Sequence, residues 1–529
     1  MTSKYSMKKY MRGALILTFA AIIVKLLSAA YRVPFQNLVG DKGFYVYQQV
    51  YPFVAFFIIW TGSGLSVAIS KMVAQSSTIE EKRRIHKTAL TFLSVCALLF
   101  FGLLYTGSDY FAKIMGDEHL SPLLQTGAFV ILFIPVLAVL RGFFQGEGNM
   151  TPVATSQVLE QTLRISIILI GAFFIMRTTG SIYDASRMAI LGTVIGELGC
   201  LIVLFIYHLK TKNKIRTPIM TPMFDYKIAK DLLFYSVTVS MSGLLLICYQ
   251  LVDSFTIYSI LTSQGLQASD AMITKGIYDR GQPLVQLGLV IASSLAMAVV
   301  PLISFKATKE KGAEIPFIQL TYKVTLVFGV AAGIGLVSVM PYVNVMLFET
   351  NSLSTVLSVY ILQIIPISLV LTLTAILQGY SKVLIPLILL VSSIGIKLIG
   401  NYLLIPFYEV LGAAIASLGA STIVAVSLLI YLRFITAKPF ACVKFYKNLF
   451  LATVGMVIVV YGVQWISHVV NGQDLSRAST IMWTFIYIAS GAGTFIFIIV
   501  KHQVLTVREW FLIPLGRRMA AFQLWLHQK

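Results

Sequence analysis

Long apolar stretches separated by short polar connectors dominate this sequence. The stretches are bounded by glycine, proline and clusters of charge. Because a helix needs roughly 20 apolar residues to cross a bilayer, the pattern predicts an all-α integral membrane protein with about fourteen transmembrane helices. The expected spans cover residues 11–35, 44–70, 89–105, 121–140, 152–176, 188–207, 232–258, 283–305, 324–347, 355–377, 384–405, 413–431, 449–469 and 481–500.

The composition agrees with this prediction. Of the 529 residues, 57% are hydrophobic and 12% are charged, and the mean hydropathy is +0.85, which excludes a chain of several soluble domains. The first apolar stretch has the basic flank of a signal peptide, but Lys25 interrupts it. We therefore expect an uncleaved first span. The four cysteines lack CxxC spacing, so neither a disulfide framework nor a metal site is expected.

Positive charge is distributed unevenly between the connectors. The chain has 41 Lys and Arg against 21 Asp and Glu, a net charge of +20. If the N-terminus is cytoplasmic, 30 of the 41 cations fall in inner connectors and tails and seven in outer ones. This asymmetry predicts that both termini are cytoplasmic. Because insertion orientation accounts for most of the charge, no nucleic-acid partner is expected.

A displacement of 233 residues aligns three separated places in the sequence. It lays segment 42–49 on segment 275–282, with Lys, Gly, Tyr and Gln identical. It also lays the Gln-Gly pair at 145–146 on the pair at 378–379, and Arg164 on Lys397. Such internal repeats are typical of transporters. We expect two six-helix lobes in a pseudo-twofold repeat, residues 1–215 and 216–435, then two further spans within residues 436–505. Residues 506–529 are expected to form an amphipathic cytoplasmic tail.

Charged residues within or beside the spans are the candidate functional residues, because a charge inside a bilayer is costly and needs a partner, water or a substrate. Cations outnumber acids at the most buried positions, which favours a positive cavity suited to a phosphate or another anion. The cations are Lys25, Arg32, Arg164, Arg280 and Lys397, and the acids, which are also candidates for coupling to an ion, are Glu160, Glu197, Asp253 and Asp279.

Structural roles compete with this interpretation. Glu160 and Arg164 are four residues apart, the spacing of an ion pair within one helix. Lys25 and Arg32 could reach the membrane surface or pair with acids of other spans. Lys397 has a serine, Ser393, where a carboxylate would match Glu160. The six histidines fall near span ends or in loops, and no GxxxxGK[ST] motif is present. We therefore expect a transporter rather than an enzyme, with no cofactor and no metal.

Several motifs resemble a known family. They are the run Arg141-Gly142-Phe143-Phe144-Gln145-Gly146, then Met150-Thr151-Pro152, then Ser156 to Gln161 with Arg164, and Tyr278-Asp279-Arg280. Together they resemble the polysaccharide transporter branch of the multidrug/oligosaccharidyl-lipid/polysaccharide exporter superfamily. That branch includes the stage V sporulation protein B group and is related to the MurJ lipid II flippases. The resemblance covers essentially the whole chain.

The resemblance implies a monomeric flippase of the bacterial plasma membrane that works by alternating access. Its partners would be membrane lipid, a coupling cation and an undecaprenyl-pyrophosphate-linked glycan, which it would move to the outer leaflet. By position, Lys25, Arg32 and Arg280 would contact the phosphates. Arg164 and Lys397 are added to these from the internal repeat alone. The alternatives are a cation-coupled multidrug exporter of the same architecture, a membrane-bound polysaccharide polymerase or glycosyltransferase, and an accessory subunit.

Overall fold

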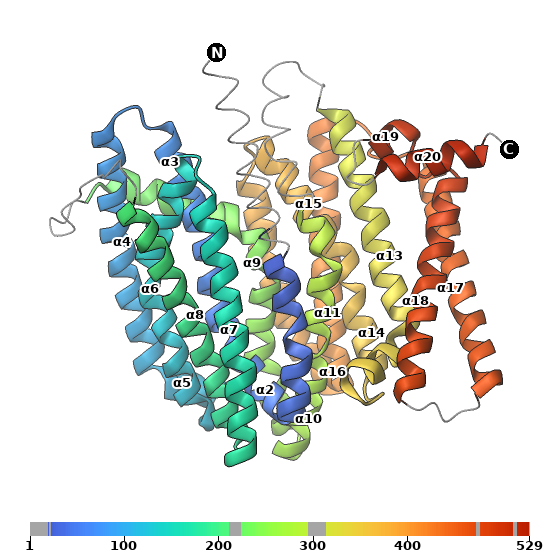
Figure 1. Ribbon diagram of the computed structural model, residues 1–529, viewed down its shortest axis with the longest axis horizontal. Coiled ribbons are helices and arrows are strands. Elements are labelled where there is room, and N and C mark those ends of the chain that lie inside the picture. Colours follow the sequence, from blue (N-terminus) through green and yellow to red (C-terminus); the bar gives the residue numbers. More distant parts are fainter. Residues whose placement is uncertain are drawn as a thin grey trace. The chain divides into compact units, whose positions relative to one another are not determined.

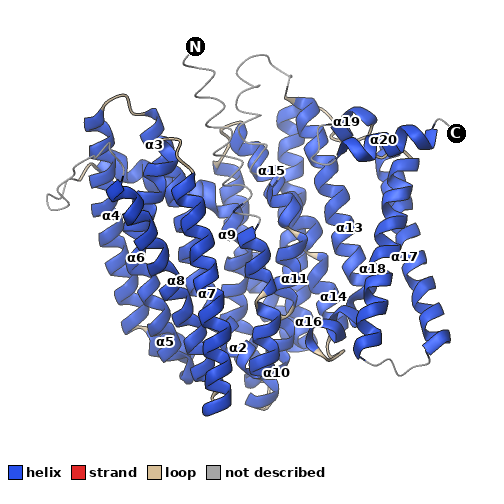
Figure 2. Ribbon diagram, viewed as in Figure 1, coloured by secondary structure: helices blue, strands red, loops and turns tan. Residues whose placement is uncertain are grey.

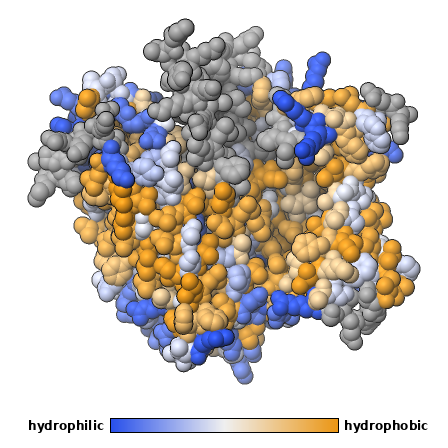
Figure 3. All heavy atoms as spheres, viewed as in Figure 1, coloured by the Kyte–Doolittle hydropathy of each residue, from blue (hydrophilic) through white to orange (hydrophobic). Residues whose placement is uncertain are grey.

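The computed structural model describes residue 20 and residues 23–210, 224–294, 314–471, 477–511 and 516–527. Helices joined by short turns and loops make up these ranges, which contain no β-strand (Figure 2). The predicted all-α membrane fold is confirmed. Side chains on the flanks of the long helices are mostly hydrophobic, whereas hydrophilic side chains gather toward the helix ends (Figure 3). This distribution is the one that a bilayer selects.

The chain forms two compact units, which are described separately. Unit 1 comprises residues 1–283 and 390–413. Its helices are α2 (Arg32–Ile59), η1 (Trp60–Leu65), α3 (Ser66–Gln75), α4 (Ile79–Thr106), α5 (Ser108–Met115), η2 (Glu118–Leu120), α6 (Ser121–Gly146), α7 (Thr151–Thr178), α8 (Ile182–Lys210), α9 (Tyr226–Ser263), α10 (Ala268–Asp279) and part of α16 (Leu384–Thr436). Figure 1 shows α4, α6, α7 and α8 running alongside one another.

Unit 2 comprises residues 284–389 and 414–529. Its helices are α13 (Ile315–Phe348), α14 (Ser354–Leu362), α15 (Ile364–Gly379), the rest of α16, α17 (Val443–Asn471), α18 (Arg477–Lys501), α19 (Val507–Phe511) and α20 (Gly516–His527). Helix α11 (Gly281–Gly288) begins in unit 1 and ends in unit 2. The expected lobe boundaries stay a prediction, because contact density in one conformation does not define which parts move together.

Two helical stretches are too long to cross a membrane once. Residues 23–75 and 384–436 each contain 53 residues, about 80 Å if straight, against a hydrocarbon core of about 30 Å. Each stretch has an internal break, at Gly40 (φ 68°, ψ −178°) and at Glu409 (φ 49°, ψ −135°). Glycine adopts a positive φ without strain. Each break lies between two spans that the sequence predicts.

Eleven helices in the described part of the chain are long and apolar enough to cross a membrane. Each of the two broken stretches counts as one of the eleven, although the sequence predicts two spans in each. The expected span 283–305 is described only as far as residue 294. The protein is therefore a multi-pass membrane protein, while the count of fourteen and the cytoplasmic termini stay predictions.

Glycine determines how closely α7 and α8 pack in unit 1. A Cβ atom at Gly196 of α8 would lie 3.0 Å from the backbone oxygen of Glu160 and 3.3 Å from Cβ of Arg164, both on α7. The absence of a side chain thus lets the two backbones approach closely, as small residues do in membrane helices. The approach occurs beside two charged residues of α7, and it brings Glu197 of α8 to them.

The amphipathic tail forms two short helices of unit 2, α19 and α20. Ala520 and Gln523 are buried, whereas Arg517, Arg518 and Trp525 are exposed. Helix α20 packs against α18, and Lys323 Nζ of α13 lies 2.8 Å from the carboxylate of Glu509 on α19. The sequence also predicts a break near Pro514, and this position lies outside the described residues.

Candidate functional site

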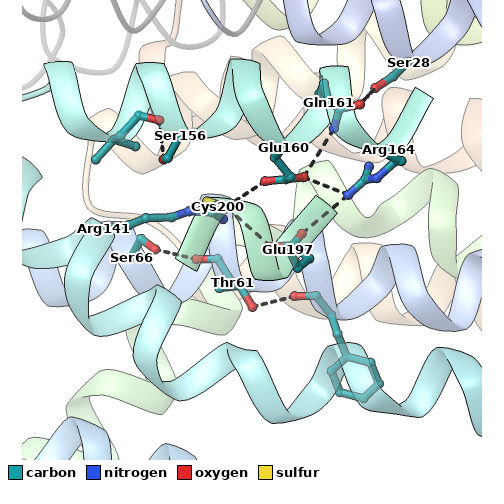
Figure 4. A network of polar contacts seen from close by, with 12 residues as sticks. Ser28, Thr61, Ser66, Arg141, Ser156, Glu160, Gln161, Arg164, Glu197 and Cys200 are labelled. Atoms are coloured by element: carbon teal, nitrogen blue, oxygen red, sulfur yellow. Dashed lines mark hydrogen bonds and ion pairs between the residues drawn. The ribbon is translucent and has the colours of Figure 1, made fainter. Parts of the chain in front are cut away.

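Four charged side chains from three helices of unit 1 form a buried group, which we call the arginine–glutamate cluster (Figure 4). Glu160 and Arg164 lie on α7, Arg141 on α6 and Glu197 on α8. Each is at most 4% exposed. Arg141 Nη2 donates to Glu160 Oε2 at 2.8 Å and Arg164 Nη2 donates to Glu160 Oε1 at 2.7 Å. The expected ion pair between Glu160 and Arg164 is therefore present, and it belongs to a larger group.

Glu197 is held less tightly than Glu160 in this cluster. Its Oε1 lies 3.5 Å from Arg164 Nη2, and its Oε2 lies 3.6 Å from Arg141 Nη2. The two guanidinium groups thus make their short hydrogen bonds to one carboxylate and only long contacts to the other. If both acids are ionised, the four charges sum to zero.

A second buried ion pair joins two elements of unit 1 that are far apart in the sequence. Lys397 Nζ of α16 lies 2.7 Å from Asp253 Oδ1 of α9 and donates to the backbone oxygen of Ala413 at 2.8 Å. Asp253 also accepts hydrogen bonds from Asn401 at 2.9 Å and Tyr278 at 3.1 Å. Lys397 is 0% exposed and Asp253 is 1% exposed. Lys397 therefore has a carboxylate partner, supplied by another helix.

The two copies of the repeated segment meet in unit 1, and we call this meeting the α2–α10 contact. Arg280 Nε donates to Asp41 Oδ1 at 3.0 Å, and Gln48 Nε2 donates to Gln282 Oε1 at 2.7 Å. A Cβ atom at Gly276 would lie 2.2 Å from the backbone oxygen of Asp41. Segment 41–49 thus packs on its own repeat at 275–282.

Asp279 lies in α10 with Lys275 as its partner. Lys275 Nζ lies 2.7 Å from both carboxylate oxygens of Asp279. Burial raises the pKa of Asp279 to about 6, and the charge of Lys275 opposes the rise. Asp279 is thus ionised at neutral pH and binds a proton in mildly acidic solution.

Arg32 at the start of α2 is a buried cation of a different kind. It is 0% exposed, and none of its three guanidinium nitrogen atoms has a hydrogen-bond partner among the described residues. Its guanidinium lies 4.6 Å from the centre of the Tyr51 ring, and the hydroxyls of Tyr31 and Tyr47 lie 2.7 Å from each other nearby in the same unit. A cation over an aromatic face gains some stabilisation, but less than a buried charge loses without an acceptor.

Lys25, in contrast, is exposed on the helix that precedes Tyr31. It lies seven residues before Arg32, a spacing that brings two residues onto nearly the same face of a continuous helix. In this conformation their surroundings differ, because one side chain is exposed and the other is completely covered.

Sequence reasoning did not assign Arg141 or Asp41 to the site. Arg141 lies between the expected spans 121–140 and 152–176, yet it is 2% exposed and belongs to the arginine–glutamate cluster. Its position as the first residue of the most specific motif was the available signal. Asp41 was not considered because it lies between two spans, although it directly precedes the repeated Lys-Gly pair.

The spacing of Glu160, Glu197 and Cys200 would also fit a metal ion, since their ligand atoms lie within 4.8 Å of one another. Arg141 Nη2, however, lies 3.0 Å from Cys200 Sγ and 2.8 Å from Glu160 Oε2. A guanidinium thus already contacts two of the three ligand atoms, and its charge would repel a metal cation. The arrangement suits anion binding or proton exchange better than metal binding.

The Asp41 and Arg280 ion pair yields a direct prediction. Changing Arg280→Asp places two acids together and removes hydrogen bonds to a charged group, which contribute about 1.5 to 3 kcal/mol each. We expect a lower melting temperature in detergent solution. The double variant Asp41→Arg with Arg280→Asp should recover most of the loss, because the attraction is restored with the charges exchanged. Equal melting temperatures for the single and double variants would show that the pair contributes no stability.

Comparison with known proteins was made with the whole chain. The model of a family described as polysaccharide biosynthesis protein matches residues 10–305. The uncharacterized membrane protein YabM of Bacillus subtilis (strain 168) is 36% identical, over 97% of this chain and 96% of that protein. The lipid II flippase MurJ of the same organism is 27% identical, over 97% of this chain and 98% of that protein. Its stage V sporulation protein B is 34% identical, over 39% of this chain and 40% of that protein.

Solved structures show the same fold at lower identity. A lipid II flippase MurJ in an inward closed conformation has a TM-score of 0.70 and 16% identity, covering 92% of this chain and 99% of that one. An inward-facing multidrug resistance MATE family transporter has a TM-score of 0.64 and 16% identity, covering 80% of this chain and 98% of that one.

Proposed function

Because this chain belongs to the polysaccharide biosynthesis protein family, in the polysaccharide transporter branch of the multidrug/oligosaccharidyl-lipid/polysaccharide exporter superfamily, we propose that it is a flippase for a lipid-linked polysaccharide precursor. The substrate is a polyprenyl-pyrophosphate-linked oligosaccharide of the undecaprenyl type, moved from the inner to the outer leaflet of a bacterial plasma membrane by alternating access. Similarity to a lipid II flippase over nearly the full length supports this substrate class.

The observation that carries the proposal is the unpartnered guanidinium of Arg32. A completely buried charge costs several kcal/mol unless an opposite charge and hydrogen bonds compensate it. Among the described residues no carboxylate pairs with Arg32 and no acceptor makes a well-formed hydrogen bond to it, its polar neighbours being the tyrosines at 31, 47 and 51. An arginine presents a planar set of donors that fits phosphate oxygens. A phosphate group would therefore supply the acceptors that this part of unit 1 lacks.

The other predicted phosphate ligands fall into two groups. Lys25 is exposed and Arg280 is paired with Asp41 in unit 1. Arg164 and Lys397 are paired with buried carboxylates. In this conformation Arg32 is thus the strongest candidate, and a role for Arg164 and Lys397 in phosphate binding requires that their ion pairs open.

A path lined by cations would lower the free-energy barrier to moving the charged part of the substrate across the bilayer. A pyrophosphate cannot enter hydrocarbon without losing its hydration, whereas its polyprenyl tail can remain in the lipid. A membrane potential of 100 mV, negative inside, favours outward movement of an anion by about 2.3 kcal/mol per charge. We therefore expect the flipping rate in proteoliposomes to rise when such a potential is imposed. A rate that responds neither to the potential nor to a cation gradient would contradict this driving force.

A cation-coupled multidrug exporter is the alternative within the same architecture, and the MATE-like fold is compatible with it. An exporter of organic cations needs carboxylates that are available to the drug. In unit 1 the buried acids Glu160, Asp253 and Asp279 each have a cationic partner within 2.8 Å, and Glu197 lies 3.5 and 3.6 Å from two arginines. These contacts favour the anionic substrate.

The deciding experiment replaces Arg32 with alanine in a strain that lacks its own flippase. Arg32→Ala is expected to abolish complementation while the protein still reaches the membrane, because the phosphate loses its main ligand. Lys25→Ala is expected to do the same. Arg177→Ala is the matched control, since Arg177 is exposed on α7 and also lies over an aromatic ring.

Growth of the Arg32→Ala strain equal to that of the control strain would remove the phosphate assignment. Native mass spectrometry of the purified protein tests the substrate class directly. Retained polyprenyl-linked glycan in the wild type, and its loss in Arg32→Ala, is the expected result. Retained lipophilic cations in place of glycan would favour the multidrug alternative.

A further inference from the structure

The two acids of the arginine–glutamate cluster differ in how closely the arginines contact them. Glu160 accepts short hydrogen bonds from Arg141 at 2.8 Å and Arg164 at 2.7 Å, and a longer one from Gln161 at 3.3 Å. Glu197 has contacts of only 3.5 and 3.6 Å to the same guanidinium groups. Since the strength of an ion pair falls with distance, Glu160 is the structural partner of both arginines. Glu197 is not required in its charged form to satisfy them.

One oxygen of Glu197, Oε2, accepts no hydrogen bond among the described residues and has only the 3.6 Å ion-pair contact to Arg141. It is buried, although an ionised carboxylate has acceptor capacity for several donors. Glu197 as a whole is 2% exposed. A buried carboxylate that lacks donors is neutralised by binding a proton more readily than one that is fully hydrogen-bonded. The geometry thus distinguishes Glu197 from Glu160, which has partners on both oxygens.

The space beside Glu197 is apolar and narrow. It is lined by Ile58, Thr61, Val130, Ile134, Leu137 and Glu197 itself. Thr61 uses its hydroxyl proton in a 2.7 Å hydrogen bond to the backbone oxygen of Phe57, so it does not donate to the carboxylate. Thr61 lies in η1, a π-helical turn, and such turns occur frequently at functional sites. Opening of this turn would admit water to a carboxylate that apolar side chains now cover.

The groups around Glu197 act in opposite directions on its protonation. Arg141 of α6 and Arg164 of α7 favour its ionised form, whereas Glu160 of α7 and burial favour its protonated form. Cys200, one helical turn further along α8, is also buried and faces Arg141 at 3.0 Å. From η1 the lining residue is Thr61, which does not titrate. Small shifts of α6 or α7 relative to α8 would change the two long contacts and with them the preferred protonation state.

We infer that Glu197 is a proton-binding site within unit 1, which holds a proton in the packing seen here and releases it when α6, α7 and α8 rearrange. The proton moves between Glu197 Oε2 and water, with no other bond made or broken. The inference extends the proposed function. Only its prediction about flipping rests on that function. An anionic head group that draws Arg164 away from Glu197 would favour proton uptake, and this links the proton to the substrate.

Infrared difference spectroscopy of the purified wild-type protein between neutral and alkaline buffer tests the site without transport, because Asp279, with a pKa of about 6, is mostly ionised throughout this range. A carboxylic acid C=O band that responds to pH and shifts in D₂O is expected. Glu197→Gln should abolish this band, whereas Glu160→Gln, the same change on a neighbouring buried acid, should retain it. Because glutamine resembles a protonated glutamate, Glu197→Gln should melt near the wild-type temperature, and Glu160→Gln should melt clearly lower.

A band that survives Glu197→Gln, or the absence of a pH-dependent band in the wild type, would overturn the inference. If Glu197→Gln does not fold, Glu197→Asp retains the carboxyl group and must move the band, and an unmoved band would again overturn it. In proteoliposomes the flipping rate should depend on pH for the wild type but not for Glu197→Gln, and equal pH profiles would refute the coupling. A band specific to Glu197 without any flipping of lipid-linked glycan would instead support the proton site and contradict the proposed function.

Discussion

Replacement of Lys397 by methionine is expected to lower the free energy of unfolding by about 3 to 5 kcal/mol, the usual effect of removing one partner from a buried ion pair. The loss arises because Asp253, which is 1% exposed, would retain its charge with only the neutral donors Asn401 and Tyr278. Methionine has a similar length and packs adaptably, so an empty cavity contributes little. Thermal unfolding in detergent solution, followed by tryptophan fluorescence, measures the change.

A second variant separates the charge from the packing. Lys397→Met combined with Asp253→Asn removes both charges and retains an acceptor for the donors around residue 253. Most of the lost stability should return, since replacing both members of a buried pair is often nearly neutral. If Lys397 also binds phosphate, the double variant will fold but will not flip substrate. A single variant as stable as the wild type would show that Asp253 finds another partner.

A side chain at position 276 is expected to disrupt the α2–α10 contact. In Gly276→Ala the Cβ atom would lie 2.2 Å from the backbone oxygen of Asp41 and 2.9 Å from its carbonyl carbon. Both are backbone atoms, so the two helices must move apart. Overpacking of this kind costs about 1 to 3 kcal/mol or more, and the Arg280 and Gln282 hydrogen bonds across the contact would weaken as well. A lower melting temperature and reduced flipping are the expected results.

Gly395→Ala is the matched control for this prediction. Gly395 also lies in a helix of unit 1, but a Cβ atom there meets nothing within 4 Å. Alanine is favoured over glycine in a helix by about 0.5 to 1 kcal/mol, so this variant should be as stable as the wild type or slightly more so. If both substitutions have the same effect, helix propensity rather than the close approach determines the outcome at Gly276.

The sequence was sufficient for the class of fold and for contacts within one helix. The apolar stretches predicted the membrane helices because hydrophobicity over about 20 residues is a local property. The four-residue spacing of Glu160 and Arg164 predicted their ion pair for the same reason. The positions of the breaks at Gly40 and Glu409 agree with the expected boundaries between spans, since polar or glycine residues interrupt the apolar pattern there.

The sequence did not predict which charged residues on different helices form ion pairs with each other. Asp253 and Lys397 are 144 residues apart, and Arg141 joins Glu160 and Glu197 only because α6, α7 and α8 pack together. Such pairings depend on the tertiary arrangement, which a single sequence does not specify. The different burial of Lys25 and Arg32 is of the same kind, because helical spacing fixes the direction of a side chain but not what covers it.

The meeting of segment 41–49 with its own repeat also bears on the origin of the chain. In an ancestral protein of half the length, the same segment on two identical subunits would form an isologous dimer interface, in which each surface patch is its own complement. Gene duplication and fusion would then have converted an association between subunits into an intramolecular contact. The two copies have since become chemically different, because Arg280 in the second copy stands where the first copy has Tyr47, a difference that two identical subunits could not carry.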